Sequence, residues 1–366
     1  MENEFVYAQP VKIFFGRGVF ARLGTVLDEL EIRRAVLVCG RHFAPEAEGL
    51  LAKDPRLAAI FAGVEQNPQL AGVEETVRLC RENGADAVIG IGGGSAMDTA
   101  KFAAAVAPNE GDALDYYRGE RVLNAKSRLT VVTVPTTAGT GSEVTQVSVV
   151  SHGTEKKTVN HPAFMPKAAI VDPLLTLGVP PRTTMNTGLD ALAHALEGYW
   201  SRNHQPIPDL LAIEAVRLVL ENLETAYRDG RNLEARENMA YAALLGGLSF
   251  ALPKTAGCHA CSYPLSEDYH LPHGEACAFT LDSFVCLNAD ARLERLCRAV
   301  GLRDTAELAE RIRGFKAMAG LHSRLRDLGE VNLNKLSRDC AAHPLMGNNP
   351  RSMDEASLRT MFEALQ

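Results

Sequence analysis

The sequence predicts an α/β domain with a doubly wound, mainly parallel sheet, followed by an all-α domain. In the first half, short β-branched runs alternate with amphipathic segments, as strands joined by crossover helices do. After the prolines at positions 180 and 181 these runs stop, while helical spacing of apolar residues continues. A chain of 366 residues is also long for one hydrophobic core. We therefore expect two domains, 1–180 and 181–366.

The predicted strands are apolar runs of strand length that end in glycine, proline or a polar residue. They are AVLVC (35–39), AVIGI (87–91), TVVTV (130–134) and AAIVD (168–172). Amphipathic segments separate them, such as residues 72–84, which end at Gly84 as helices often do. In the second half, helical spacing marks residues 185–201, 207–228, 232–252, 274–299, 304–328 and 332–343.

Composition and charge exclude several classes of partner. Hydrophobic residues at 46% and charged residues at 23% are ordinary for a globular protein. A net charge of −7 without long Lys/Arg runs argues against nucleic acid or an anionic membrane and favours a small-molecule partner. The N-terminus lacks the pattern of a signal peptide, and no apolar run reaches the roughly 20 residues that cross a bilayer. We expect a cytoplasmic protein.

The eight cysteines are scattered along the chain, which suits reduced thiols better than a disulfide framework. Cys258 and Cys261 form a C-x-x-C pair, but no second pair completes a structural zinc knuckle.

A glycine-rich turn follows the predicted strand 87–91. In AVIGIGGGSAMDTAK (87–101), Gly92, Gly93 and Gly94 allow backbone N–H groups to approach an anion, and Ser95 stands at the start of a helix. Such a turn is either a tight connection or a cradle for pyrophosphate. A second turn, VPTTAGTGSEVT (134–145), follows another strand and offers threonine hydroxyls. Two such turns after neighbouring parallel strands favour a dinucleotide site.

Asp190 and His194 are four residues apart in a stretch of helix formers, hence on one helical face. Alone, this pair is also compatible with an exposed polar face. With His259 and His273 it gives one carboxylate and three imidazoles, which suit Fe²⁺, Zn²⁺ or another first-row metal such as Mn²⁺.

Five motifs in order resemble the iron-containing (group III) alcohol dehydrogenases. They are GGGSAMDTAK, VPTTAGTGSEVT, AIVDP, GLDALAHALE and PHGEA, and the resemblance runs from PVKIFFGRG (10–18) to the C-terminal helices. It implies a dinucleotide-binding α/β domain, an all-helical metal domain, NAD(P)H as cofactor and an aldehyde or alcohol as substrate. It implies Asp190, His194, His259 and His273 as metal ligands, with Fe²⁺ as the first expectation. We also expect a homodimer or a higher homo-oligomer, since two-fold symmetry is the commonest arrangement.

The resemblance also implies cofactor contacts. Gly92, Gly93, Gly94, Ser95 and Asp98 would lie on the pyrophosphate and nicotinamide side, and Thr136, Thr137, Thr140 and Lys157 would contact phosphates, carboxamide or ribose. Lys157 could equally be a solvated charge beside Lys156.

Two positions depart from the family pattern. Many members carry a histidine four residues after the third ligand, often proposed to relay a proton, where this chain has Tyr263. A phenol is a poorer proton acceptor near neutrality, so Tyr263 would orient the substrate or simply pack. NAD-preferring members commonly carry an aspartate after the first strand, where this chain has Gly40 and Arg41. We therefore expect NADPH to be accepted, unless Arg41 points to solvent.

The S-Y-P-L pattern around Tyr263 looks like a subgroup that reduces anionic aldehydes such as phosphonoacetaldehyde or sulfoacetaldehyde. A maleylacetate reductase and a dehydroquinate synthase-like lyase are the alternative enzymes. The metal-independent maleylacetate reductases tend to replace the first aspartate, which is present here as Asp190. The lyases need several basic residues for a phosphate-bearing substrate and fit the GLDALAHALE pattern poorly. A non-catalytic scaffold fits the complete ligand set least well.

Overall fold

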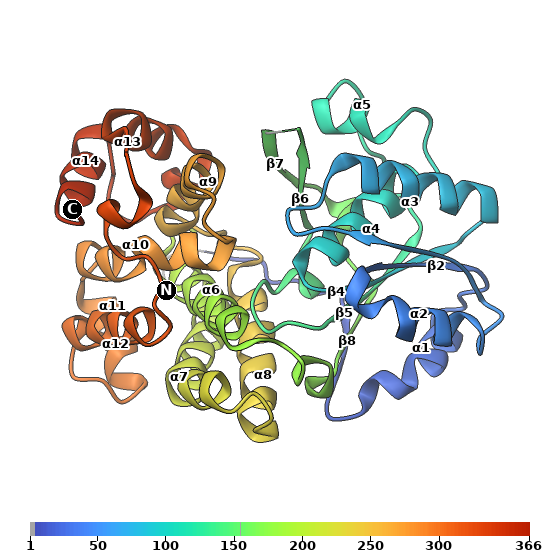
Figure 1. The fold of residues 1–366 in the computed structure, drawn as a ribbon, viewed down its shortest axis with the longest axis horizontal. Helices are drawn as coiled ribbons and strands as arrows, with labels where there is room; N and C mark the ends of the chain where they lie inside the picture. Colours follow the sequence, from blue (N-terminus) through green and yellow to red (C-terminus); the bar gives the residue numbers. More distant parts are fainter. Residues whose placement is uncertain (1–3, 154) are drawn as a thin grey trace. The chain divides into compact units, whose positions relative to one another are not determined.

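The computed structural model describes residues 4–153 and 155–366, which form two compact units. The α/β unit comprises residues 8–137 and 141–177. The helical unit comprises residues 178–366, the short segment Ala138–Thr140 and residues 4–7. Figure 1 shows strands gathered in the α/β unit and helices alone in the other.

The α/β unit is built on a six-stranded, fully parallel sheet in the order β1-β8-β5-β4-β2-β3. The strands are β1 (Lys12–Phe15), β2 (Ala35–Gly40), β3 (Leu57–Val64), β4 (Ala87–Gly92), β5 (Thr130–Pro135) and β8 (Ala168–Val171). The four strands predicted from the sequence are β2, β4, β5 and β8. The chain passes from β2 to β3, at one edge of the sheet. From β4 it passes to β5, which lies on the other side of β4. The order of the strands therefore reverses between β2 and β4.

Helices cover both faces of this sheet, which confirms the doubly wound fold. Alternate residues of β2 point to opposite faces: Val36 and Val38 pack in one core, and Leu37 and Cys39 in another. The first core includes residues of α3 (Leu70–Asn83), α4 (Gly94–Val106) and α5 (Ala113–Arg118). The second includes residues of α1 (Leu23–Glu29) and α2 (Ala44–Leu51). Short 3-10 turns occur at Val19–Arg22, Arg41–Phe43, Ser142–Val144, Pro162–Phe164 and Pro173–Thr176.

Four strands were not predicted. β1 has only four residues. β3 is an edge strand of mostly half-buried residues, and its sequence LAAIFAGV has no continuous β-branched run. The other two, β6 (Val147–His152) and β7 (Glu155–Asn160), form a separate antiparallel pair. β7 alternates exposed and half-buried residues and therefore lacks the apolar run on which the prediction depended.

The helical unit contains α6 (Pro181–Trp200), α7 (Pro206–Arg228), α8 (Leu233–Phe250), α9 (Gly257–Tyr269), α10 (His273–Leu287), α11 (Ala291–Ala299), α12 (Thr305–Met318), α13 (Leu333–Ala342) and α14 (Glu355–Glu363). Two 3-10 turns, η6 (Leu325–Leu328) and η7 (Pro344–Asn348), complete it. The segment predicted as one helix over 274–299 is two, because the Asp290 carboxylate accepts the backbone N–H groups of Arg292 and Leu293 and starts α11. The segment predicted over 304–328 ends as α-helix at Met318.

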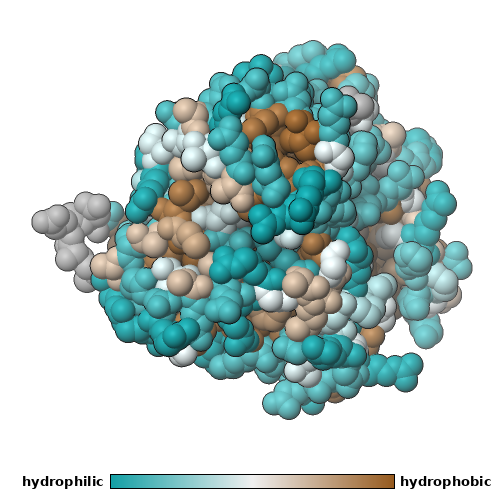
Figure 2. All heavy atoms as spheres, turned by 60° about the vertical axis from the view of Figure 1, so that its left-hand side comes forward, coloured by the Kyte–Doolittle hydropathy of each residue, from teal (hydrophilic) through white to brown (hydrophobic). Residues whose placement is uncertain are grey.

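The surface in Figure 2 is mainly hydrophilic, with smaller hydrophobic areas between. Among the described residues, the exposed large hydrophobic side chains are Phe5, Val6, Val122, Leu174, Ile207, Leu210 and Tyr241. No helix in the described part of the chain is long and apolar enough to cross a membrane.

Candidate functional site

The four predicted metal ligands come together inside the helical unit. Asp190 and His194 lie one turn apart on α6, His259 lies on α9, and His273 is the first residue of α10. One oxygen, Asp190 Oδ1, is 3.8 Å from His194 Nδ1, 3.6 Å from His259 Nε2 and 3.7 Å from His273 Nε2. Each separation is too long for a hydrogen bond and fits two ligands that share an ion at about 2.0–2.2 Å.

Burial identifies atoms that need a partner. Asp190, His194 and His259 are buried, and Asp190 Oδ1, His194 Nδ1 and His259 Nε2 have no hydrogen-bond partner. Burying such atoms unpaired is costly, and a cation between them would satisfy all three. The donor set of one carboxylate and three imidazoles therefore fits a divalent first-row metal ion.

The protonation states of His194 and Asp190 also suit metal binding. Burial lowers the pKa of His194 to about 4, although the charge of Asp190 opposes this shift. Burial alone would raise the pKa of Asp190, but the surrounding histidines outweigh it and hold that pKa below its usual range. A neutral imidazole and an ionised carboxylate are the forms that bind a metal.

Glu197, which sequence reasoning missed, fixes His259. It lies on α6, three residues after His194, and is fully buried. Its Oε2 contacts His259 Nδ1, and its Oε1 accepts the backbone N–H groups of Ala256 and Cys258 at 3.0 and 2.7 Å. Because Glu197 holds the proton of Nδ1, Nε2 is the nitrogen that His259 can offer to a metal ion on the side of Asp190. The signal in the sequence was the final glutamate of GLDALAHALE, on the same helical face as both ligands.

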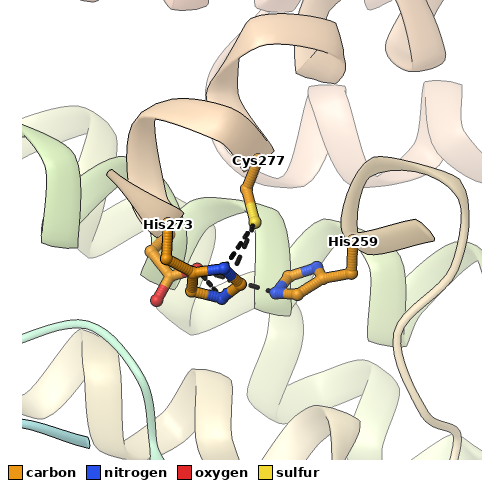
Figure 3. Close-up of side chains that lie close together, drawn as sticks. His259, His273 and Cys277 are labelled. Carbon is orange, nitrogen blue, oxygen red and sulfur yellow. Dashed lines mark hydrogen bonds and ion pairs between the residues drawn. The ribbon is translucent and has the colours of Figure 1, made fainter. Parts of the chain in front are cut away.

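Cys277 also lies at the centre and was not predicted. It follows His273 by one turn of α10, and its Sγ is 3.9 Å from His273 Nε2. Ligand atoms of Asp190, His259, His273 and Cys277 all lie within 4.8 Å of one another. Figure 3 shows the His259 and His273 rings facing each other with Cys277 beside His273. Burial raises the pKa of the Cys277 thiol, but a coordinating metal ion deprotonates a thiol, so Cys277 is a further candidate ligand.

Aromatic packing encloses part of the centre. The Phe250 ring stacks on His194 at a centroid distance of 4.3 Å and an interplanar angle of 15°. Tyr263, one turn after His259 on α9, stacks on His343 at 4.3 Å and 26°. Phe250 and His343 were also missed, because neither belongs to a local motif.

In the α/β unit, the predicted cofactor residues lie at the carboxyl edge of the sheet. Gly92 ends β4 with a φ of +154°, and a Cβ there would lie 2.8 Å from the Cβ of Ala96. Gly93 is the N-cap of α4, and Gly94 and Ser95 are its first two residues. The start of α4 thus lies where the strand order reverses, which is the usual place for a dinucleotide in such sheets.

The neighbouring strand ends carry further predicted residues. Thr136 follows β5 and donates its backbone N–H to the carbonyl of Gly92 at 2.9 Å. Thr137 Oγ1 is 3.3 Å from the position that a Cβ on Gly93 would take. At the end of β2, Gly40 is half-buried and Arg41 is exposed. These residues form a cradle of small and hydroxyl side chains along three adjacent strands.

Three predicted cofactor residues have other surroundings. Asp98 is buried and accepts hydrogen bonds from Ser142 Oγ at 2.6 Å and the backbone N–H of Val149 at 2.9 Å. Lys157 Nζ donates to the carbonyl of Tyr117 at 2.7 Å. Thr140 belongs to the short segment that packs with the helical unit. Cofactor contact by these three residues, as by the other predicted cofactor residues, stays a prediction.

The sequence matches the iron-containing alcohol dehydrogenase model over residues 10–173 and the C-terminal model of the same family over residues 184–365. The chain belongs to the iron-containing alcohol dehydrogenase family. It is 37% identical over 321 residues to long-chain-alcohol dehydrogenase 1 of Geobacillus thermodenitrificans, which covers 83% of this chain and 81% of the relative. It is 30% identical over 385 residues to sulfoacetaldehyde reductase of Bilophila wadsworthia, with 98% of each chain covered.

Among solved structures of this family, the chain resembles sulfoacetaldehyde reductase from Bifidobacterium kashiwanohense in complex with NAD⁺. The TM-score is 0.94 at 37% identity, over 99% of both chains. The expected family, the expected fold and the expectation of an oxidoreductase are thereby confirmed. As an iron-containing alcohol dehydrogenase, the chain is an enzyme of alcohol and aldehyde chemistry.

Proposed function

We propose that this enzyme reversibly reduces a small aldehyde to a primary alcohol with NAD(H), and that Asp190, His194, His259 and His273 hold one divalent metal ion. The observation that carries the proposal is the convergence of three imidazoles on one buried carboxylate oxygen. The cofactor side rests on the cradle at the start of α4 and on the NAD⁺ complex of the related reductase.

A divalent ion at this centre supplies Lewis acidity, which stabilises negative charge on the oxygen of an aldehyde. The protein's own groups prepare the site for that chemistry. Asp190 contributes the negative charge, Glu197 keeps a proton on His259 Nδ1, and the Phe250 ring covers one face of His194. The backbone N–H groups at the start of α4 bind the pyrophosphate of the cofactor, which carries the hydride.

We propose an anionic aldehyde, such as sulfoacetaldehyde or phosphonoacetaldehyde, as the preferred substrate. Two similar proteins are named sulfoacetaldehyde reductases, and Tyr263 stands where typical relatives carry a histidine. The test is a comparison of kcat/KM for sulfoacetaldehyde, phosphonoacetaldehyde, propanal and butanal with NADH on protein of defined metal content. A higher kcat/KM for uncharged aldehydes would reject the substrate class and leave aldehyde reduction standing. Inactivity with all four would reject the proposed function.

We also propose that NADPH is accepted as well as NADH. The proposal rests on Gly40, which supplies no carboxylate to repel a 2′-phosphate, and not on Arg41, which is exposed. Gly40→Asp should fold, because a Cβ at Gly40 meets its nearest atom, the Val64 carbonyl oxygen, at an ordinary 3.5 Å. We expect this variant to lose about tenfold or more in kcat/KM for NADPH while that for NADH changes little. A wild-type preference for NADH above about a thousandfold would contradict the proposal.

For the ion we propose Fe²⁺, with Zn²⁺ and Mn²⁺ as the alternatives, and for the assembly a cytoplasmic homodimer or higher homo-oligomer. Three imidazoles and a carboxylate suit all three ions, so availability in the cell contributes to the choice. Elemental analysis of protein purified without oxygen identifies the ion. Analytical ultracentrifugation determines the assembly.

A further inference from the structure

Tyr263 is held by a residue far away in the sequence. It lies four residues after His259 on α9, hence on the same helical face as that ligand. Its ring stacks on His343, with centroids 4.3 Å apart and ring planes 26° apart. Stacked rings favour particular mutual orientations. His343 therefore limits the orientations that the Tyr263 ring can take.

His343 is suited to this contact because its ring is fixed and neutral. Its Nδ1 accepts the backbone N–H of Leu345 at 3.3 Å, which places the proton of the neutral ring on Nε2. Burial, with a further contribution from the nearby His259, lowers the pKa of His343 to about 4. The Tyr263 ring thus packs against an uncharged imidazole at neutral pH.

The backbone that carries His343 is anchored on its C-terminal side. Pro344 follows directly and favours the extended conformation observed for His343, with φ −69° and ψ 131°. Asn348 donates to the carbonyl of Thr255 at 2.9 Å. The buried Asn349 exchanges two hydrogen bonds with Asn288, at 3.0 and 3.1 Å. The ring of His343 is therefore part of a rigid segment.

On the other side of the pair, Pro264 restricts the backbone of Tyr263. A proline inside a helix has no N–H for the carbonyl four residues earlier, here that of Ala260, and it limits the residue before it. Ser262 Oγ also donates to the carbonyl of His259 at 2.8 Å. Pro264 thus restricts the backbone of Tyr263, and the His343 ring restricts the orientation of its side chain.

We propose that His343 is a positioning residue, which holds the Tyr263 phenol in the orientation from which it donates a hydrogen bond to the substrate. The inference rests on the proposed function and extends it. This chain places a phenol four residues after His259 and a separate imidazole, that of His343, against the phenol ring. The pair orients the substrate.

Two substitutions distinguish the effect of the His343 ring from the effect of its hydrogen bond with the backbone N–H of Leu345. His343→Phe keeps an aromatic face, whereas His343→Asn keeps an acceptor for the Leu345 N–H and loses the face. We expect His343→Phe to stay within about threefold of wild-type kcat/KM for the best aldehyde, and His343→Asn to lose about tenfold. In a Tyr263→Phe background, which lacks the phenol, His343→Asn should cost less than about twofold.

A second measurement does not depend on activity. With 3-fluorotyrosine incorporated, the ¹⁹F resonance of residue 263 reports the ring stacked on it. We expect that resonance to move in His343→Asn and to remain shifted in His343→Phe, with metal content unchanged in both. His204→Phe is the matched control, since His204 is a half-exposed side chain paired with Asp209 in the same unit.

The outcomes decide between explanations. Equal loss in His343→Phe and His343→Asn, or additive effects of His343→Asn and Tyr263→Phe, would overturn the positioning role. An unchanged ¹⁹F resonance in His343→Asn would also overturn it, even in protein without measurable turnover. A wild type inactive with every aldehyde, combined with the expected ¹⁹F shifts, would reject the proposed function and leave the stacked pair intact.

Discussion

Glu197 determines which nitrogen of His259 is available for a metal ion. Its Oε2 contacts His259 Nδ1, while its Oε1 is held by the backbone N–H groups that begin α9. A carboxylate can only accept in this position, so His259 must carry its proton on Nδ1. The second nitrogen then faces Asp190 unprotonated, as a ligand requires.

Glu197→Gln tests this assignment with little change in volume. The backbone N–H groups of Ala256 and Cys258 still need an acceptor, so the amide oxygen of the glutamine takes the place of Oε1. The amide nitrogen then faces His259 Nδ1. The amide N–H and the Nδ1–H of His259 would then face each other as two donors, unless the His259 proton moves to Nε2. A proton on Nε2 blocks metal binding. We expect metal affinity to fall about 10–100-fold, measured by competition with a chelator of known affinity.

The matched control is Glu363→Gln, which removes an exposed carboxylate paired with Arg359 on α14. Its metal affinity should equal that of the wild type. Equal affinity in Glu197→Gln would mean that His259 is oriented by other contacts.

The candidate ligands could be selected from the sequence because their residue types and spacing carry the signal. Asp190 and His194 share a helical face, and His259 and His273 complete a metal-type donor set. Glu197 and His343 were not predictable in this way. Glu197 acts on a side chain 62 residues later, and His343 lies 80 residues beyond Tyr263, so only the fold brings each pair together.

At the scale of elements, the centre depends on how closely α10 approaches α6. Gly274, directly after His273, lies against α6, and a Cβ there would be 2.1 Å from the carbonyl oxygen of Asn186 and 3.3 Å from the Asp190 Cβ. The obstacle is backbone, which cannot move aside as a flexible side chain can. His273 reaches Asp190 only because its neighbour has no side chain.

Gly274→Ala should therefore move the start of α10 away from α6. We expect a loss of about 1–3 kcal/mol in the free energy of unfolding, typical of overpacking, and weaker metal binding. Urea denaturation and the chelator competition measure the two effects. Gly314→Ala on α12 is the matched control, because it is exposed and no atom lies within 4 Å of its added Cβ. It should stabilise the protein by about 0.5–1 kcal/mol, and destabilisation equal to that of Gly274→Ala would contradict the explanation.

α6, α7 and α8 were predicted from the helical spacing of their apolar residues, although each contains glycine or proline. α9 and α14 were not predicted. α9 begins at Gly257 and contains Pro264, both unfavourable in a helix considered alone. A Cβ on Gly257 would lie 2.3 Å from the Phe284 ring, so this glycine is required by packing on α10 and does not mark a loop.

At the scale of the whole molecule, metal and cofactor should stabilise different units. The predicted metal ligands all lie in the helical unit, and the cradle at the start of α4 lies in the α/β unit. A ligand stabilises the part of a protein that must be folded to bind it, by about 4 kcal/mol at a thousand times its Kd. Metal removal also leaves three buried polar atoms without a partner, all of them on α6 and α9.

Hydrogen exchange measured by mass spectrometry locates these effects along the chain. Chelation should speed exchange in α6, α9 and the first turns of α10, while the strands of the parallel sheet keep wild-type rates. NAD⁺ added to metal-free protein should slow exchange after β4 and in the first turn of α4, where we propose that the backbone N–H groups bind the pyrophosphate. Glu197→Gln without added metal should resemble the chelated wild type in α9. Chelation that sped exchange equally in both units would point to a general loss of stability and not to the loss of a local metal centre. That result would contradict the assignment of Asp190, His194, His259 and His273.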